Sequence, residues 1–330
     1  MKTSEKVLQL LLKKQAFLSG QELADELNVS RTAVWKAIQS LQEEGYQIES
    51  KPRIGYRYIE GLKLSEASIR RFLNPELDLN FEIYDTIDST NNRCSQKAMD
   101  PETKTPLVVI SDSQKAGHGR YGRPFASPVG GGIYISILLD NDDPDFNPGL
   151  LTTATAIAVT RTIEKLVHAR CEIKWVNDLY LNGKKICGIL TEGVTDFESG
   201  MIESIVIGYG VNFRDDAHLP EELRPIVGSV FGAEPPTVTR SALAAAMLAE
   251  LLPLAEDLSS RSFLPEYRRR SMLLGREIVF SRAGGRFAAV AEGIDDNGGL
   301  VVRLPDGSRE TLRSGEVSVR TAESAGTLPE

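Results

Sequence analysis

Cysteine, histidine and long apolar runs are all scarce in this sequence, and each scarcity excludes a class of protein. The three cysteines, Cys94, Cys171 and Cys187, are odd in number, far apart and without a C-x-x-C pair, which argues against a disulfide framework and a zinc site. Only three histidines are present, too few for a metal site built from several of them. No stretch reaches the roughly 18 apolar residues of a membrane span, and the first residues lack the apolar run of a signal peptide. We therefore expect a cytoplasmic protein in a reducing compartment.

The composition is that of an ordinary globular chain. Hydrophobic residues make up 41% and charged residues 25%, which excludes a largely disordered chain and a collagen-like repeat. At 330 residues the chain exceeds the roughly 100 to 200 residues of one domain, so two or three domains are expected. The net charge of −8 repels phosphate, and any contact with nucleic acid would therefore need a local basic face.

Residues 1–62 predict three short helices followed by a two-stranded hairpin. Ser19 and Glu22 form an S-x-x-E capping box that opens the second helix, and Ser30 caps the third. In that third helix an apolar stripe with the spacing i, i+4, i+7 begins at Val34 and faces the core. The second and third helices are joined by a short link, which is the arrangement of a helix-turn-helix.

The charge of this region favours a DNA-binding role. Across residues 28–58, five basic residues stand against three acidic ones, so the sign of the charge reverses inside an acidic protein. We predict that the third helix lies in the major groove and that the hairpin contacts the phosphate backbone as a wing. The predicted contacts are Ser30, Arg31, Thr32, Trp35 and Lys36 on the helix, and Lys51, Arg53 and Arg57 on the wing. The alternative is a helical protein-interaction module or a capping subdomain whose positive face arises by chance.

The rest of the chain changes character near residue 270. Before it, apolar patterns predict strands at 107–110, 133–139, 173–175, 186–190 and 205–211 and helices at 149–169 and 241–258, which indicates a mixed sheet with helices packed against it. After it, short β-rich segments alternate with the turn pairs Gly284-Gly285, Asn297-Gly298 and Asp306-Gly307. We expect a small β-barrel or sandwich there, followed by a loose tail.

A loop rich in glycine and arginine follows the first expected strand of the middle region. Gly117, Gly119 and Gly122 let the backbone approach a bulky anion, and Arg120 and Arg123 offer forked donors that fit phosphate or carboxylate. The loop is not a Walker A motif, because G-x-x-x-x-G-K-[ST] is absent. We interpret it as an anion clamp; the alternative is a flexible surface loop.

Two further polar stretches stand at the ends of expected elements. The run Lys174-Trp175-Val176-Asn177-Asp178 precedes a tight turn and a returning strand with Lys185, which can place a carboxylate and an ammonium around one substrate. Upstream, Asp88-Ser89-Thr90-Asn91 opens a helix. An ordinary hairpin with solvated lysines is the alternative. Because three unusual polar stretches seldom coexist without a shared site, we favour one site built from all three.

Together these stretches resemble the ligase signatures of a known family, the bifunctional biotin protein ligase and biotin operon repressor of bacteria. The signatures are Asp-Ser-Thr-Asn, Gly-x-Gly-Arg-x-Gly-Arg, Lys-Trp-Pro-Asn-Asp, a Lys followed by Gly-Ile-Leu, and Gly-x-Gly-x-Asn, which residues 208–212 match. The resemblance covers nearly the whole chain and implies an α+β multidomain protein. Its parts would be a winged helix-turn-helix DNA-binding domain at 1–62, a class II synthetase-like mixed sheet with helices at 63–269 that binds biotin and ATP, an SH3-like β-barrel at 270–322 and a tail at 323–330.

The resemblance also implies a set of residues for each ligand, carried over by matching motif. Lys185 and Arg120 would be catalytic, and Asp178 would hold Mg²⁺. Biotin would be bound by Ser89, Thr90, Asn91, Gln114, Gly117, His118, Gly119, Arg120, Lys185 and Gly188. ATP would be bound by Gly119, Arg120, Gly122, Arg123, Phe125, Asn177, Asp178, Lys185 and Asn212.

The sequence departs from the family pattern at three of its positions. His118 stands where the family often has Arg, which removes one fixed charge from the loop. Phe125 stands where the family often has Trp and can still stack on adenine. Val176 replaces the Pro of Lys-Trp-Pro-Asn-Asp and alters only the local geometry of the strand.

The reaction that the resemblance implies has two steps. A biotin carboxylate attacks the α-phosphorus of ATP to give biotinyl-adenylate and pyrophosphate, and a lysine of a biotin carboxyl carrier protein, the acetyl-CoA carboxylase subunit, then attacks the mixed anhydride. Because both reactants of the first step are anions, the site needs cations. Lys185 would bridge the carboxylate and the α-phosphate, and Arg120 would offset the charge that develops there. Residues 115–127 are expected to be mobile without ligand and to fold over the adenylate.

The resemblance further implies regulation. An adenylate-bound homodimer would bind operator DNA through two winged helices and repress biotin genes, with no membrane partner. Two other functions stay open. One is a regulator that senses biotin or its adenylate without ligating it, against which the retention of Arg120, Asp178 and Lys185 argues. The other is a lipoate-type ligase, against which the winged helix and the stretch 174–178 argue.

Overall fold

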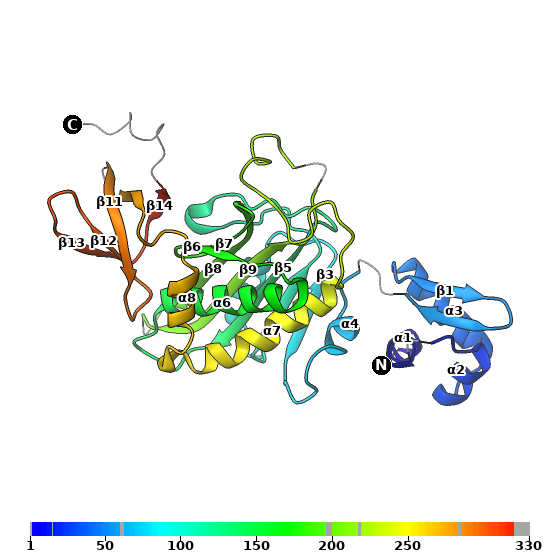
Figure 1. Cartoon of the computed structure of the whole chain (residues 1–330). Helices are drawn as coiled ribbons and strands as arrows, with labels where there is room; N and C mark the ends of the chain where they lie inside the picture. The colour runs from blue at the N-terminus through cyan, green and yellow to red at the C-terminus, as the bar shows by residue number, and fades with distance from the viewer. Residues whose placement is uncertain are drawn as a thin grey trace. The chain divides into compact units, whose positions relative to one another are not determined.

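The structure, a computed structural model, describes residues 2–14, 16–59, 63–195, 200–216, 219–282 and 285–319. The chain divides into two compact units, one of Met1–Asp78 with Thr237–Ala246 and the other of Leu79–Pro236 with Met247–Glu330. The first unit carries the N-terminal helices and hairpin, and the second carries two larger β-sheets (Figure 1). Among the helices of the described residues, none is long and apolar enough to cross a membrane.

The first unit contains the three helices and the hairpin that the sequence predicts. The helices are α1 (Thr3–Lys14), α2 (Gly20–Leu27) and α3 (Arg31–Glu43), and strands β1 (Ile48–Lys51) and β2 (Gly55–Tyr58) pair antiparallel. The capping box is confirmed, because Ser19 Oγ accepts a hydrogen bond from Glu22 N at 3.1 Å and Glu22 Oε2 accepts one from Ser19 N at 2.7 Å. Ser30 Oγ caps α3 by accepting from Ala33 N at 3.1 Å.

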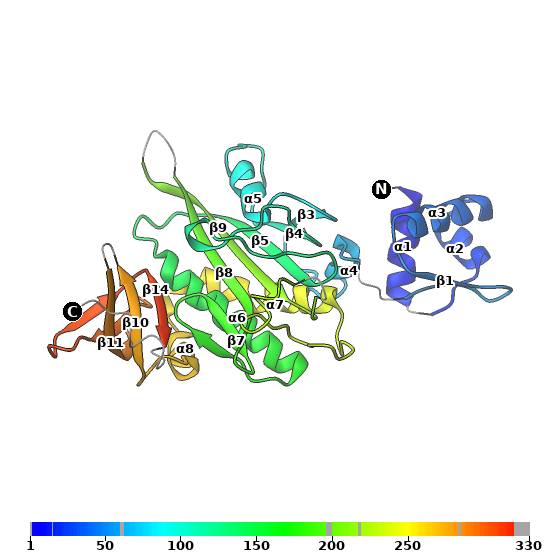
Figure 2. The ribbon, with the colours of Figure 1, turned by 90° about the horizontal axis from the view of Figure 1, so that it is seen from above.

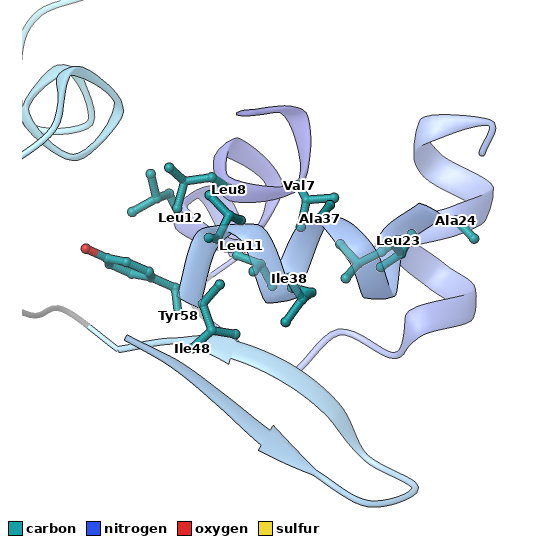
Figure 3. Close-up of a cluster of buried hydrophobic side chains, with 12 residues drawn as sticks. Val7, Leu8, Leu11, Leu12, Leu23, Ala24, Ala37, Ile38, Ile48 and Tyr58 are labelled. Carbon is teal, nitrogen blue, oxygen red and sulfur yellow. The ribbon is translucent and has the colours of Figure 1, made fainter. Parts of the chain in front are cut away.

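The apolar faces of these helices meet in one core (Figure 3). Val34, Ile38 and Leu41 of α3 pack there with Leu11 of α1 and Leu23 of α2, and each of the five is at most 2% exposed. Helices of this length are marginal by themselves in water, so the shared core is what stabilises them. The predicted apolar stripe of α3 is therefore confirmed.

The hairpin is fastened to the segment between α1 and α2. Leu18 N donates to Tyr56 O at 2.9 Å and Tyr56 N donates to Leu18 O at 2.8 Å. This approach requires glycine at Gly55, whose φ is +132° and where a Cβ would overlap the Leu18 carbonyl. A further helix, α4 (Glu66–Arg70), for which the sequence shows no pattern, packs on the same core through Ala67.

The second unit is built on a mixed sheet whose described strands have the order β3-β4-β5-β9-β8-β7-β6. Among them the β3–β4 pair is parallel and the other neighbouring pairs are antiparallel. All five strands predicted from the sequence are present, whereas the edge strand β3 is only half-buried and shows no clear apolar pattern. The strands are β3 (Asn80–Tyr84), β4 (Leu107–Ser111), β5 (Gly132–Asp140), β6 (Glu172–Lys174), β7 (Asp178–Leu181), β8 (Lys184–Thr195) and β9 (Ile202–Asn212).

Helices cover both faces of this sheet. Helix α5 (Thr90–Ala98) packs Cys94 against Val109, Leu138 and Val206 on one face. Helix α6 (Pro148–Val167), the predicted helix at 149–169, lies against the other face (Figure 2). Two more helices follow in the chain: α7 (Arg240–Glu256), which matches the prediction at 241–258, and α8 (Leu264–Arg270).

After residue 270 the chain forms a second, antiparallel sheet with the described order β13-β12-β11-β10-β14. Its strands are β10 (Glu277–Arg282), β11 (Gly285–Ile294), β12 (Leu300–Arg303), β13 (Arg309–Leu312) and β14 (Glu316–Val319). The predicted turns at Asn297-Gly298 and Asp306-Gly307 are confirmed, each with a glycine of positive φ. Gly284 and the predicted tail at 323–330 lie outside the described residues.

The expected barrel is open in this structure. The edge strands β13 and β14 are not paired with each other within the described residues, although the small antiparallel sheet agrees with an SH3-like architecture. Closure requires strands that are long and staggered enough for the two edges to meet. Within the described residues β13 and β14 have four residues each, and these edges do not meet.

Candidate functional site

A cavity of about 290 Å³ opens on the face of the mixed sheet that carries α5. Its walls come from segments that are far apart in the sequence: the start of α5, the loop at 118–125, strands β5, β8 and β9, the run 174–178 and strand β14. The three polar stretches that the sequence singles out therefore do share one site, as predicted.

Three glycines of two adjacent strands form the floor of the cavity. Gly188 on β8 and Gly210 on β9 are directly paired across the two strands, and Gly208 lies two residues along β9 on the same face. A Cβ at Gly208 would overlap the side-chain oxygen of Asn91, and a Cβ at Gly210 would lie 2.5 Å from the Phe125 ring. The absence of side chains at these positions therefore lets Asn91 and Phe125 approach the strand backbone closely.

One wall is uncharged and rich in hydroxyl and amide groups. Gln114 Oε1 accepts from Thr90 N at 2.8 Å and from Thr90 Oγ1 at 3.1 Å. Ser136 Oγ lies 2.7 Å from Thr90 Oγ1 and 2.6 Å from Asn91 Oδ1. Ser89 begins α5 as its N-cap. Because these groups are buried and already oriented by one another, they suit a ligand with neutral donors and acceptors.

The loop of glycines and arginines folds as a tight hairpin over the cavity. Gly119 N donates to Arg123 O and Phe125 N donates to Gly117 O, both at 2.8 Å. At the tip Tyr121 adopts a φ of +58° and is exposed. The Phe125 ring meets that of Tyr134 edge to face, at 6.4 Å between centroids. The hairpin thus presents its backbone and the side chains of its arginines toward the cavity.

Arg120 lies at the end of the cavity that the C-terminal sheet borders. Its Nη1 donates to Gly315 O at 3.3 Å and to Asn177 Oδ1 at 3.5 Å, and its guanidinium lies 5.3 Å from the centre of the Tyr121 ring. Asn177 is itself held by Ile189, whose backbone oxygen accepts from Asn177 Nδ2 at 3.0 Å. These neutral partners leave the charge of Arg120 available for an anion.

Lys185 and Asp178 form an ion pair in the cavity, with 2.7 Å between Nζ and Oδ1. Asp178 Oδ1 is buried, so its charge depends on this contact with Lys185. A bulge in the β7–β8 pairing brings Lys185 opposite Tyr180. Burial, and then the nearby Asp178 charge, raises the pKa of Tyr180.

The charge of the cavity selects for an anion. Among the described residues that line it, the basic side chains are Arg120, Arg123, Lys174 and Lys185, and the one carboxylate is Asp178. A surplus of cations in a concave, partly buried site attracts a negatively charged ligand more strongly than the same charges would on an open surface.

Most residues of the predicted ligand set line this cavity: Ser89, Thr90, Asn91, Gln114, His118, Gly119, Arg120, Arg123, Phe125, Asn177, Asp178, Lys185 and Gly188. Three lie elsewhere. Gly117 is buried under the hairpin, and Gly122 lies at its tip with open space around it. Asn212 lines a neighbouring cavity of about 210 Å³, which shares Phe125 and Lys185 with the first.

The sequence motifs do not predict one wall of the cavity. Gly315, Val317 and Ser318, on and just before β14, border the cavity, as does Tyr134 on β5. No local motif marks these residues. Gly315, Val317 and Ser318 reach the site because the C-terminal sheet docks there, which a linear pattern does not reveal, whereas Tyr134 lies on a predicted strand of the mixed sheet itself.

In the first unit, the predicted DNA-contacting face of α3 is exposed. Arg31, Thr32, Trp35 and Lys36 all face outward, and Trp35 is 53% exposed although it is a large apolar residue. The hydroxyl of Ser30 is engaged in the helix cap. The side chains are therefore placed as DNA contact by a helix-turn-helix requires.

The wing is less positive than its sequence suggests. Glu49 holds two of its cations: Arg57 Nη2 lies 2.6 Å and Lys51 Nζ 3.2 Å from its carboxylate. Hydrogen bonds from Arg57 and then Lys51 lower the pKa of Glu49. Both cations also lie over the ring of Phe17, at 4.7 and 4.8 Å. Arg53, at the turn, lies outside this cluster.

Comparison with known proteins agrees with this architecture. A sequence model of the HTH domain matches residues 3–57, that of the biotin/lipoate A/B protein ligase family matches 83–212, and that of the biotin protein ligase C terminal domain matches 273–320. The bifunctional ligase/repressor BirA of Bacillus spizizenii is 33% identical over 299 residues, which cover 89% of this chain and 91% of that protein. The chain belongs to the family of bifunctional biotin ligases and repressors. The resemblance seen in the motifs is thus confirmed.

Other members of the family match over similar lengths. The bifunctional ligase/repressor BirA of Escherichia coli is 29% identical over 323 residues, which cover 95% of this chain and 96% of that protein. Among solved structures, the biotin protein ligase from Aquifex aeolicus in complex with biotin and ATP superposes with a TM-score of 0.62 at 23% identity, covering 74% of this chain and 99% of that one. At this level of identity, the likeness to the Aquifex aeolicus structure shows the fold alone.

The cluster around Glu49 leads to a prediction about DNA binding. Replacing Glu49 by Gln frees Lys51 and Arg57 to contact phosphates, so we expect several-fold tighter binding of any duplex DNA. The salt dependence should steepen, by roughly 0.9 in the slope of log K against log salt for each additional phosphate that the wing neutralises. Fluorescence anisotropy over a salt series measures both quantities. Glu26→Gln, which removes an exposed carboxylate of α2, is the control for net charge alone. Equal effects of the two changes would show that Glu49 has no special role.

Proposed function

We propose that this protein activates biotin with ATP to biotinyl-5′-AMP, transfers biotin to a lysine of a biotin carboxyl carrier protein, and represses biotin genes as an adenylate-bound homodimer on operator DNA. As a member of its family it is a biotin protein ligase that also carries the DNA-binding domain of a repressor. The roles of individual residues, the domain limits at 1–62, 63–269 and 270–322, and the cytoplasmic location are part of the proposal.

One observation carries the ligase part. Arg120 and Lys185 come from separate polar stretches and line the same cavity. The first step of the reaction brings a carboxylate against a triphosphate, and the mutual repulsion of these anions must be offset by cations. A cavity with four basic side chains and one carboxylate among its described lining meets that need.

The uncharged wall suits the ring end of biotin. A ureido group has two N–H donors and one carbonyl acceptor, which hydroxyl and amide side chains can satisfy without charge. Ser89, Thr90 and Gln114 supply such groups, and Asn91 lies beside the glycine floor. With Gly117, His118 and Gly119 of the hairpin, they are the residues that we assign to biotin, whose carboxylate would then point toward Lys185 and Arg120.

The neighbouring cavity suits the nucleotide. Its lining includes Asn212, the apolar side chains of Leu219, Leu223 and Val227, and the charged side chains of Lys185, Arg214, Asp215 and Asp216. Asn212 Nδ2 donates to Gly228 O at 2.9 Å, which turns the side-chain oxygen into a fixed acceptor for an amino group such as that of adenine. Phe125 stands between the two cavities and offers a ring for stacking.

Lys185 borders both cavities, which supports its role as the bridge between the two reactants. In the first step a carboxylate oxygen bonds to the α-phosphorus and the bond from that phosphorus to pyrophosphate breaks. In the second, the acceptor amine attacks the carbonyl carbon and AMP leaves with the bonding electrons. Alignment of bound reactants can supply roughly 7 to 11 kcal/mol of the barrier, against about 1.5 to 3 kcal/mol for each charged hydrogen bond. Positioning therefore dominates.

The Cys187 thiol and the Asp178 carboxylate determine whether the site could use a thiolate nucleophile or a metal ion. Burial raises the pKa of the Cys187 thiol, so this cysteine offers no thiolate nucleophile.

The described residues contain no group of three His, Cys, Asp or Glu that could cage a metal ion. Asp178, a carboxylate that lines the cavity beside Lys185, would hold Mg²⁺ as a single protein ligand, since Mg²⁺ commonly takes its other ligands from phosphates and water. Mg²⁺ would supply charge neutralisation of the triphosphate.

The hairpin at 117–125 lies where it can cover the adenylate. Its strands are held by the backbone bonds at Gly117 and Gly119, and its arginines border the cavity. Closure over the mixed anhydride would exclude water, which otherwise hydrolyses it. Ordering of this loop by the adenylate is the change that we expect to promote dimer formation, so that two winged helices engage two half-sites together.

The ligase role predicts the effect of Lys185→Ala. Loss of the bridging charge should reduce pyrophosphate release from biotin and ATP by at least about 10²- to 10³-fold. A coupled pyrophosphate assay measures this, and Lys184→Ala, the adjacent lysine outside the cavity, should retain nearly full activity. Near-normal turnover of Lys185→Ala would refute its role. If the unmodified protein releases pyrophosphate with lipoate and not with biotin, the lipoate-type alternative holds instead.

The glycine floor predicts a second result. In Gly208→Ala the added methyl overlaps Asn91, so biotin binding should weaken by at least about tenfold through loss of shape. Isothermal titration with biotin alone tests this without ATP. Gly293→Ala, at a strand position with nothing within 4 Å of the new methyl, is the matched control. Unchanged affinity in Gly208→Ala would place biotin elsewhere.

The repressor role predicts the effect of Arg31→Ala. Removing an exposed cation from the start of α3 should weaken operator binding and leave ligation intact, because the residue belongs to the unit without the cavity. Electrophoretic mobility shift with the biotin operon promoter and the pyrophosphate assay provide the two readouts. Operator binding unaffected by Arg31→Ala would argue against α3 as the reading helix.

A further inference from the structure

Trp175 links the ligand cavity to the C-terminal sheet. Its side chain is 4% exposed, and its indole Nε1 donates to Gly298 O at 2.8 Å. Gly298 lies in the turn between β11 and β12, more than a hundred positions later in the sequence. Trp175 also borders the cavity and stands two residues before Asn177. One side chain therefore joins the predicted site to a part of the chain for which the motifs assign no role.

The turn that receives this bond is rigid. Asp295 Oδ1 accepts from Asn297 N at 2.9 Å and from Gly299 N at 2.7 Å, and Gly298 N donates to Asp295 O at 3.2 Å. The turn also packs closely on α6, because a Cβ at Gly298 would lie 3.3 Å from Thr153 Cγ2. The carbonyl that accepts from the indole is thus held in a fixed position relative to the sheet behind it.

Two pairs of hydrogen-bonded strands connect the turn at Gly298 to the wall of the cavity. Strand β11 pairs with β10 over six residue pairs, and β10 pairs with β14, where Phe280 is opposite Val317. Val317 and Ser318 border the cavity, and Gly315 O accepts from Arg120. Since a hydrogen-bonded sheet moves as a unit, fixing its turn at Gly298 fixes the wall at β14.

We propose that Trp175 is a positioning residue whose indole N–H holds the C-terminal sheet against the site, so that β14 closes one wall and retains the acyl-adenylate. This inference rests on the proposed function. Biotin itself would be bound by the uncharged wall at the start of α5. This tether, the bond from Trp175 to Gly298, should therefore matter for the nucleotide and for retention of the intermediate rather than for binding of biotin alone.

A neighbouring bond provides a matched control. Tyr267 OH donates to Val176 O at 3.0 Å and the Tyr267 side chain is fully buried, so Tyr267→Phe also removes one buried hydrogen bond of the same dipeptide, here one that the dipeptide accepts. That bond comes from α8 and does not involve the turn at Gly298, whereas Arg268 of the same helix contacts the turn through Ile294 O and Asp296 and is unchanged in this variant. If Trp175 acted merely by stiffening its own segment, Trp175→Phe and Tyr267→Phe would have equal effects.

The test uses full-length protein with Trp175→Phe, which keeps the ring and removes the N–H. We expect preformed biotinyl-adenylate to dissociate about fivefold to tenfold faster and the KM for ATP to rise similarly, as loss of one buried hydrogen bond implies. The affinity for biotin alone should stay within twofold, as should adenylate release from Tyr267→Phe. Unchanged release in folded Trp175→Phe, an equal loss of biotin affinity, or equal effects of both variants would overturn the proposal.

A second measurement does not depend on activity. Hydrogen exchange of the β14 amides in ligand-free protein should speed up in Trp175→Phe and not in Tyr267→Phe; unchanged exchange would overturn the tether. If Trp175→Phe does not fold, Asp295→Ala serves as the alternative, because it loosens the turn and lies outside the cavity. This variant should show the same faster exchange of the β14 amides and the same faster release of the adenylate. The absence of both changes would overturn the proposal. A wild-type protein that forms no adenylate from biotin and ATP would refute the proposed function, whereas the exchange result would still decide the tether.

Discussion

The electrostatic repulsion between a carboxylate and a triphosphate is the physical constraint that explains the basic side chains of the site. A carboxylate and a triphosphate do not approach each other in water without a counter-charge, and a protein that joins them has to place cations where their charges meet. Here Lys185 borders both cavities and Arg120 borders one end of the first. In the structure their charges are balanced only by Asp178 among the described lining residues of the first cavity, so the site is ready for an anionic ligand.

The backbone is as important to this site as the side chains. Gly188 and Gly210 are paired across β8 and β9, and Gly208 follows on the same face, so the two strands leave room for other side chains to pack on their backbone. Asn91 and Phe125 approach that floor so closely that a methyl group at Gly208 or Gly210 would collide with them. The register of two adjacent strands therefore sets the shape of the cavity, and a shift of one residue would fill it.

Much of the molecule could be predicted, and the reasons differ from part to part. The N-terminal helices and hairpin follow from local signals, namely caps at Ser19 and Ser30 and the apolar stripe of α3, and the structure agrees with them. The central strands were also predictable, because buried strands are apolar runs. Strand β3 and helix α4 were not, since β3 is half-buried and α4 has only five residues. The pairing of Lys51 and Arg57 with Glu49 depends on the facing register of β1 and β2, and it lowers the positive charge that the sequence assigns to the wing.

The sequence by itself determined which chemical groups the site would use, because each contiguous motif carries its own residues wherever the chain folds. Only the tertiary structure decided where those groups meet, that the C-terminal sheet is open in this structure, and that β14 with Gly315, Val317 and Ser318 forms a wall of the cavity. The physical reason is that this wall depends on contacts such as the bond from Trp175 to Gly298, between residues far apart in the chain. Periodicity and motifs report on neighbours along the sequence, whereas docking of one sheet on another depends on shape and hydrogen bonding in space.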